Sequence, residues 1–314
     1  MRTLLEIRLL PALAVAAIVI ILPYFFPSAY YYRIGALVFI SALAVVGLNL
    51  LMGFAGQVSL GHAGFLGIGA YSVAIGPVYF GLPSWLCLFV GATVSGAVAF
   101  LVGRPILRLK GHYLAVATLG FGLLVAIVLT NEAGWTGGPD GMSVPRLALF
   151  NWQVRGSDSW YWIAGTTLVG GFVLARNLME SPTGRALQAI HDSEIAALVL
   201  GIDVARKKLT IFVISAMYAS VAGSYLALFN GHVTPDVAGF LRSIELVAMV
   251  VLGGMGSIVG SLVGAAVLVV LPQALTIFHE YEQALLGFIL MVFMIFLRRG
   301  IVPSVAATFA GRRK

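Results

Sequence analysis

Long apolar runs, separated by short polar segments, extend along almost the whole chain. Most are about 17–25 residues long, the length that a helix needs to cross the hydrocarbon core of a bilayer. Their hydrophobicity is continuous rather than alternating, which disfavours a membrane β-barrel. The pattern therefore predicts an all-α, polytopic helical membrane protein, with apolar runs at residues 9–26, 34–52, 58–78, 85–102, 113–130, 161–178, 209–229, 258–278 and 284–297.

The stretch at 47–71 is apolar enough to lie in a bilayer, yet it contains polar residues and many glycines. Asn49, Gln57, Ser59 and His62 would each cost free energy in lipid unless they faced protein or water. Helices broken by glycine are tolerated in membranes where they line a cavity or pack within protein. We interpret the stretch as the wall of a path for a polar solute, and helix packing with incidental hydrogen bonds is an equally open alternative.

A second interruption, LGGMGS at 252–257, places Gly254 and Ser257 within an apolar run in the other half of the chain. If residues 244–252 form a half-helix and the chain then turns back, the basic C-terminus ends on the same side as the N-terminus. We therefore predict about eight full spans plus a re-entrant or broken helix pair. Many transporters contain paired repeats with interrupted helices, so an internal repeat is a further hypothesis.

The one sizeable polar segment on the predicted inner side is residues 178–208, and it carries the start and stop signals of a short helix. Ser181 suits an N-cap, Pro182 the first helical position and Gly201 the residue just past the end. Apolar residues recur between them at spacings of three and four, so we expect one amphipathic helix of about 18 residues. Such a helix lies on a membrane surface or docks into the groove of a partner.

Composition and charge support this topology. With 60% hydrophobic and 10% charged residues, the chain lies outside the range of soluble domains. The net charge of +7 does not indicate a nucleic-acid partner, because fifteen basic residues fall in segments predicted inside and four outside. Both termini are accordingly expected on the inside, and the longest outer loop spans 131–159. The four outer basic residues are Arg33, Arg146, Arg155 and Arg242.

The sequence contains no recognisable catalytic or metal-binding constellation. GxxxxGK[ST] and HExxH are absent, the five histidines are scattered, and Cys87 is the single cysteine. Asp140 and Asp158 lie in a turn-rich loop and are better explained as solvated residues than as a carboxylate pair. Ser59 and His62 lack a third member, which argues against hydrolysis. We expect no enzyme activity, no metal and no cofactor in this chain.

Five blocks of the sequence, taken in order, resemble a known family. They are GLNLLMGFAGQVSLGHAGFLGIGAY at 47–71, GHYLAVATLGFG at 111–122, TGGPDG at 136–141, SPTGRALQAIHDSEIAALVLGID at 181–203 and ELVAMVVLGGMGSIVGSLVGA at 245–265. They are similar to the permease subunits of branched-chain amino-acid ABC importers, the LivM type especially. The likeness runs over nearly the whole chain, and its first and fourth blocks are the most specific.

The resemblance implies a single transmembrane permease domain over 1–314 in a bacterial inner membrane. It implies as partners a second homologous permease, two cytoplasmic ATP-binding subunits that hydrolyse ATP, and a periplasmic amino-acid-binding protein. The segment 178–208 then becomes a cytoplasmic coupling helix, and 131–159 becomes a periplasmic loop. The implied coupling residues are Arg185, Ala186, Ile190, Glu194, Ala196, Ala197 and Gly201, of which Glu194 departs from the usual importer motif. The candidate path residues are Asn49, Gln57, Ser59, His62, Gly254 and Ser257.

Two alternatives stay open at this point. Broken helices also suit a stand-alone secondary transporter or channel, although such proteins usually carry a charge at mid-membrane and none is well placed here. Within the resemblance, close relatives carry urea, short amides or aromatic acids. The sequence does not separate these substrates from leucine, isoleucine and valine.

Overall fold

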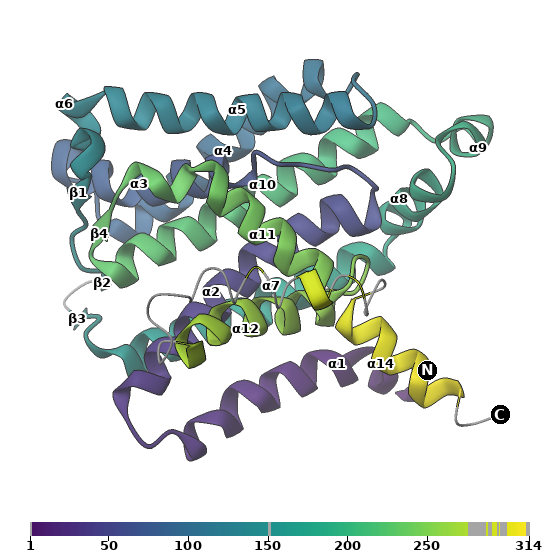
Figure 1. Cartoon of the computed structure of the whole chain (residues 1–314), viewed down its shortest axis with the longest axis horizontal. Coiled ribbons are helices and arrows are strands. Elements are labelled where there is room, and N and C mark those ends of the chain that lie inside the picture. Colours follow the sequence, from purple (N-terminus) through teal and green to yellow (C-terminus); the bar gives the residue numbers. More distant parts are fainter. Residues whose placement is uncertain are drawn as a thin grey trace.

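The structure is a computed structural model that describes residues 2–149, 152–275, 287, 291–293, 295 and 300–311. Helices make up most of this part of the chain, and their axes run mainly along the long axis of the molecule (Figure 1). The predicted last run, 284–297, lies outside the described residues except for a few isolated positions.

The elements follow the apolar runs, with turns and proline or glycine residues at their boundaries. The α-helices are α1 (Arg2–Ile21), α2 (Ala29–Asn49), α3 (His62–Phe80), α4 (Ser84–Ile106), α5 (His112–Asn131), α6 (Ala133–Thr136), α7 (Gly156–Glu180), α8 (Pro182–Asp192), α9 (Glu194–Val199), α10 (Val204–Asn230), α11 (Phe240–Gly253), α12 (Ile258–Leu275) and α14 (Ile301–Gly311). Short helical turns are η1 (Leu22–Phe25), η2 (Leu50–Phe54), η3 (Gly138–Asp140) and η4 (Pro235–Ala238), of which η2 is a π-helix.

Five helices of the described chain are long and apolar enough to cross a membrane. They are α2 continued by η2, α3, α4, α5 and α10, and shorter apolar stretches lie in α1 and α12. These helices establish the predicted multi-pass helical membrane protein. The finer predictions, about eight full spans and an internal repeat, stay predictions.

Helix α2 lies at the centre of the fold. Nearly every residue from 36 to 52 is buried, and the helix packs against α7, α10, α11 and α12. A helix that is apolar and buried on all sides belongs in the interior of a bundle. Helix α5, in contrast, buries few of its apolar side chains, as expected for a helix at the lipid-facing or subunit-facing edge.

The two ends of the bundle differ in structure (Figure 1). One end carries two antiparallel ribbons, β1 (Met142–Ser143) with β4 (His232–Val233) and β2 (Ala148–Leu149) with β3 (Trp152–Gln153). These two-residue strands do not change the predicted all-α class, and three of them lie in the predicted outer loop 131–159. The other end carries α8 and α9, and α1 begins and α14 ends there as well.

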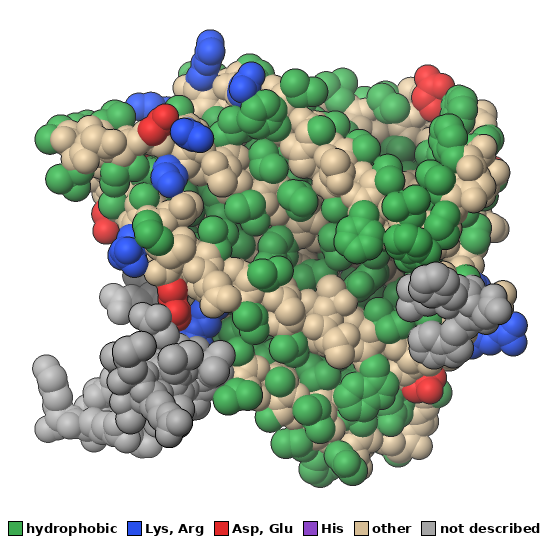
Figure 2. All heavy atoms as spheres, turned by 180° about the vertical axis from the view of Figure 1, so that it is seen from behind, with side chains coloured by type: hydrophobic (Ala, Val, Ile, Leu, Met, Phe, Trp, Pro, Cys, Tyr) green, Lys and Arg blue, Asp and Glu red, His purple; other side chains and the backbone are tan. Residues whose placement is uncertain are grey.

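Charged side chains follow the same division. On the face shown in Figure 2, hydrophobic side chains cover the middle of the molecule, and Lys and Arg gather mainly at the end that bears α8 and α9. A basic end next to an apolar middle is the arrangement that the positive-inside rule describes.

Candidate functional site

The chain leaves the helical conformation between η2 and α3, at residues 55–61, which confirms the predicted first interruption. Side chains of other helices accept hydrogen bonds from one backbone N–H group of the interruption and from one in the first turn of α3. Thr118 Oγ1 accepts from Leu60 N at 3.1 Å, and Ser243 Oγ accepts from Ala63 N at 3.1 Å. Irregular backbone within a membrane protein requires such internal partners. Helices α5 and α11 therefore support the interruption.

The second interruption is the turn at 254–257 between α11 and α12, and the two helices pack against each other as a hairpin. Gly254 begins the turn with a φ of 114°, a conformation that favours glycine. Helix α11 has 14 residues, and at 1.5 Å per residue it is about 21 Å long, shorter than the ~30 Å core of a bilayer. The predicted turning back of the chain is confirmed.

Asn49, at the end of α2, bonds directly to this second turn. Its Nδ2 donates to the carbonyl oxygen of Ser257 and to Oγ of Ser261, both at 2.8 Å. Its Oδ1 accepts from the backbone N–H of Gly256 at 2.9 Å. The side chain is 1% exposed, so these bonds satisfy both of its donors and its acceptor inside the protein.

The backbone of η2, just before the first interruption, also touches the second turn. A Cβ atom built on Gly53 would collide with the backbone nitrogen of Gly256 and with Asn49 Oδ1. Only a residue without a side chain permits this approach. Segments more than 200 residues apart thus form one unit, which we call the junction: Asn49, Gly53 and residues 254–257. It contains three of the six candidate path residues, namely Asn49, Gly254 and Ser257.

The other three candidate path residues are buried and take no part in the hydrogen bonds of the junction. Gln57, Ser59 and His62 are each at most 2% exposed, and His62 Nε2 lies 3.3 Å from Ser215 Oγ of α10. Both amide atoms of Gln57, Ser59 Oγ and His62 Nδ1 have no hydrogen-bond partner among the described residues. Buried polar groups left unpaired cost free energy. These side chains therefore offer an unsatisfied polar interior to water or a solute, and their role in a path stays a prediction.

The predicted single helix of about 18 residues is instead two helices, α8 and α9, and this is a correction. Ser193 separates them with an extended backbone, and its Oγ accepts from Ala196 N at 3.3 Å. A serine N-cap begins a new helix where an uninterrupted amphipathic pattern would have continued. The predicted boundaries hold, because Ser181 caps α8, Pro182 is its first residue and Gly201 follows α9 with a φ of 76°.

The bend divides the apolar residues of this segment into two sets. Leu187, Ile190 and Ala197 are buried, and the last two pack with Val204 in a small cluster. The exposed set lies on and just after α9, at the end of the molecule that carries the basic side chains. Its members are Ile195 (77% exposed), Leu198 (59%), Val199 (83%) and Leu200 (75%).

The implied coupling residues are divided between the buried and the exposed faces of the segment. Ile190 and Ala197 are buried, Arg185 donates from Nη1 to the carbonyl of Glu180 at 3.0 Å, and Glu194 pairs with Lys208 of α10. Lys110 Nζ lies 3.9 Å from the second carboxylate oxygen of Glu194. Of the remaining implied residues, Ala186 is half-buried, whereas Ala196 and Gly201 are exposed.

The Glu194–Lys208 pair is expected to hold α9 against the bundle. Lys208 is only 8% exposed, so Glu194→Gln leaves a buried ammonium group without its counter-charge, at a cost of about 1–2 kcal/mol. Hydrogen exchange measured by mass spectrometry should become about tenfold faster in α9 than in the parent. Glu245→Gln is the matched control, because Glu245 pairs with Arg242 at the exposed surface, and it should leave exchange in α9 unchanged. Unaltered exchange in both variants would contradict this role.

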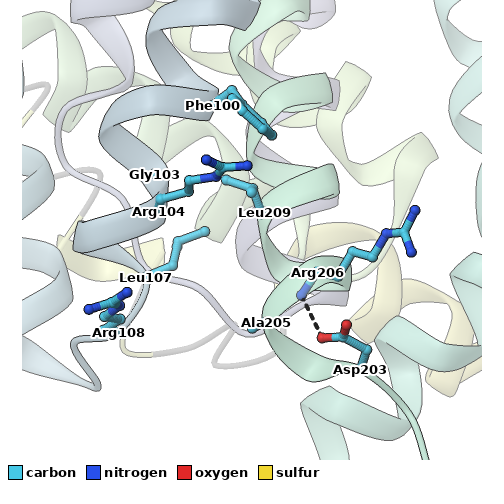
Figure 3. A pocket seen from close by; sticks show the side chains of 9 residues that line it. All are labelled: Phe100, Gly103, Arg104, Leu107, Arg108, Asp203, Ala205, Arg206 and Leu209. Carbon is cyan, nitrogen blue, oxygen red and sulfur yellow. Dashed lines mark hydrogen bonds between the residues drawn. The ribbon is translucent and has the colours of Figure 1, made fainter.

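A pocket of about 620 Å³ lies beside this segment, between the last turn of α4 and the first turn of α10 (Figure 3). Arg104 reaches into the gap between the two helices, and its guanidinium carbon lies 4.2 Å from the centre of the Phe100 ring. Asp203 caps α10 by accepting from Arg206 N at 2.9 Å. The pocket therefore adds a basic rim to the end of the bundle that carries α8 and α9.

Sequence reasoning missed several residues of these sites. Thr118, Ser243 and Ser261 support the interruptions, and the available signal was a hydroxyl residue inside an apolar run. Val199 and Leu200 were missed because one continuous helix was assumed. The signal for the bend was Ser193 followed by Glu194, a common beginning of a helix.

Comparisons with known proteins agree with this architecture. The family model for the permease component of branched-chain amino acid transport systems matches residues 30–296. The chain is 38% identical over 282 residues to the high-affinity branched-chain amino acid transport system permease protein LivM of Salmonella typhimurium, covering 82% of this chain and 66% of that protein. For LivM of Escherichia coli K12 the identity is 37% over 294 residues, covering 86% and 69%.

A second kind of permease from these systems also matches. LivH of Escherichia coli K12 is 27% identical over 286 residues, which cover 83% of this chain and 90% of that protein. No solved structure matches the chain. The chain spans about two thirds of the length of the two LivM relatives. Because the family model covers most of the sequence, the chain belongs to the family of permease components of branched-chain amino acid transport systems.

Proposed function

We propose that the protein is a membrane-spanning permease subunit of an ATP-driven importer for branched-chain amino acids. It forms the translocation path together with a second, homologous permease, and it receives substrate from a periplasmic binding protein. Membership of the permease family supports the substrate class, and the similarity to both LivM and LivH supports a pair of related permeases. The protein lies in a bacterial inner membrane, and partner subunits bind and hydrolyse ATP.

The observation that carries this proposal is the exposed apolar set of α9. Ile195, Leu198, Val199 and Leu200 project from the basic end of the bundle rather than from its apolar middle. A contiguous exposed apolar patch at a polar end is typical of a protein interface. We assign it to the ATP-binding subunit, which places this end and both termini in the cytoplasm, in agreement with the excess of Lys and Arg there.

The contacts of α8 suggest how movement of α9 reaches the membrane. Helix α8 packs against η2, and a Cβ atom built on Gly56 would lie 2.9 Å from His191 Nδ1 near the end of α8. A displacement of the α8–α9 segment is thus transmitted to the first interruption, and through Asn49 to the second. The two interruptions then shift together, which switches the path between outward and inward openings.

The double variant Ile195→Ser, Val199→Ser tests the docking surface. Loss of two exposed apolar anchors should weaken attachment of the ATP-binding subunit about ten- to hundredfold and lower amino-acid uptake about tenfold. The measurement is the ratio of ATP-binding subunit to permease after extraction in mild detergent, together with uptake of labelled leucine. Leu241→Ser is the matched control, because Leu241 is 75% exposed at the opposite end of the bundle.

Two results would contradict the proposal. Stoichiometric co-purification and full uptake in the double variant would remove α9 from the interface. A wild-type protein that is extracted alone and catalyses flux in liposomes without ATP would be a self-sufficient carrier or channel.

A further inference from the structure

A pocket of about 520 Å³ lies at the end of the bundle opposite α8 and α9. Arg33 of α2, Arg146 of the loop before β2 and Arg155 at the start of α7 all line it. Its floor is apolar and buried, and includes Val154 and Trp160. Three arginines, one from α2 and two from the segment around β2 and β3, therefore line one hollow.

The distribution of charge makes this clustering informative. Of the nineteen basic residues, four lie in segments predicted outside, and three of those four line this pocket. Topology alone accounts for basic residues at the α8–α9 end, because the positive-inside rule favours them there. It does not account for three arginines around one pocket on the side where the rule disfavours them.

The three arginines are largely free of internal partners. Among the described residues, Arg155 donates from Nη2 to Gln153 Oε1 at 2.9 Å, and neither Arg33 nor Arg146 forms a side-chain hydrogen bond or ion pair. All three side chains are exposed. Guanidinium groups bind carboxylates in bidentate geometry when a partner supplies them.

The beginning of α7 adds to the positive potential of the pocket. Gly156 and Ser157, the first residues of this 25-residue helix, lie in the wall, and no side chain caps the helix at Arg155. The free N–H groups and the helix dipole at an uncapped N-terminus attract an anion. The carboxylate of Asp158 in the first turn of α7 offsets part of this dipole, so the positive potential of the pocket comes mainly from the three arginines.

The lining also indicates which anion fits. It contains no Asp or Glu, and the nearby Asp158 does not line it. A free amino acid carries an ammonium group beside its carboxylate and needs an acidic or carbonyl-rich partner for it. A carboxylate on a protein surface has no such requirement, so the pocket suits acidic side chains of a protein better than a zwitterion.

We propose that this three-arginine pocket is the docking site for an acidic patch on the protein that delivers substrate to the outer face. The inference rests on the proposed function, since it names the surface with which the binding protein is engaged. Charged contacts at such an interface raise the association rate and orient the partner. The pocket therefore guides delivery and makes no selection among amino acids.

The test uses the importer reconstituted in nanodiscs and the binding protein that stimulates the ATPase of the wild-type complex. The triple variant Arg33→Gln, Arg146→Gln, Arg155→Gln should raise the Kd of that protein at least tenfold at low salt and flatten its salt dependence. ATPase activity without binding protein should stay at the wild-type level. The control is Arg242→Gln, which removes an outer arginine that pairs with Glu245 outside the pocket and should change the Kd less than twofold.

The possible outcomes separate this inference from the proposed function. If the wild-type complex binds no such protein, the importer assignment itself fails. If the wild type binds it and the triple variant binds equally well with the same salt dependence, the docking site is wrong and the importer assignment stands. Binding of labelled leucine to the complex without binding protein, lost in the triple variant, would overturn the inference in favour of a site for free substrate.

Discussion

Replacing Asn49 by leucine is expected to lower the free energy of unfolding by about 3 kcal/mol and to abolish uptake. The substitution removes three hydrogen bonds that join the end of α2 to the second turn and to α12. The N–H of Gly256 loses its protein partner, whereas the carbonyl of Ser257 still accepts from the N–H of Ser261. Single hydrogen bonds between membrane helices contribute only about 0.6 kcal/mol on average. The larger effect expected here comes from the loss of three hydrogen bonds at once, all made by a single side chain that is 1% exposed.

Thermal unfolding in detergent and uptake in proteoliposomes measure the two effects of Asn49→Leu. Asn131→Leu is the matched control, because Asn131 is exposed at the end of α5 and should shift stability by less than about 0.5 kcal/mol. Ser261→Ala removes one bond of the junction and should give an intermediate effect. An Asn49→Leu protein with wild-type stability and uptake would show that the junction does not hold the two interruptions together.

Replacing Gly223 by alanine is expected to cost about 3 kcal/mol or more. Gly223 lies where α10 crosses α3, and an added Cβ would collide with the carbonyl oxygen of Leu66. Gly69 meets the carbonyl of Ser220 in the same way from the other helix. Because the neighbouring atoms are backbone, no side-chain rotation relieves the clash, and the helices must separate.

The control for Gly223→Ala is Gly170→Ala, in the middle of α7. A Cβ atom there meets nothing within 4 Å, and alanine replaces glycine in a helix with a gain of about 0.5–1 kcal/mol. Unfolding midpoints of the two variants in the isolated subunit should therefore move in opposite directions. Equal stability of both variants would mean that the α3–α10 crossing adjusts without cost.

The sequence allowed the interruptions to be predicted but not their contact. Glycines and serines within apolar runs were sufficient to locate breaks at 55–61 and 254–257, because few other patterns interrupt a membrane helix. Nothing local to Asn49 specified that its amide would bond to Gly256. Such a pairing depends on how α2 and α11 pack, which is a property of the whole bundle.

The α8–α9 segment and the three-arginine pocket illustrate two further limits. Periodicity located the amphipathic segment, yet the serine cap at Ser193 overrode the continuous helix, since local capping competes with an extended pattern. Loop charge located Arg33, Arg146 and Arg155 on one side of the membrane. Only the fold placed them around one hollow.

The junction also has a consequence for how the protein is made. Asn49 and its partner Ser257 are 208 residues apart, so at about 5–20 residues per second the ribosome needs about 10–40 s to supply the second turn after the first interruption is synthesised. During that interval the amide of Asn49 lacks its native partners. Nascent chains that end before residue 254 therefore retain an unsatisfied polar group in α2, and they should be better substrates for membrane quality-control proteases than chains that extend past α12.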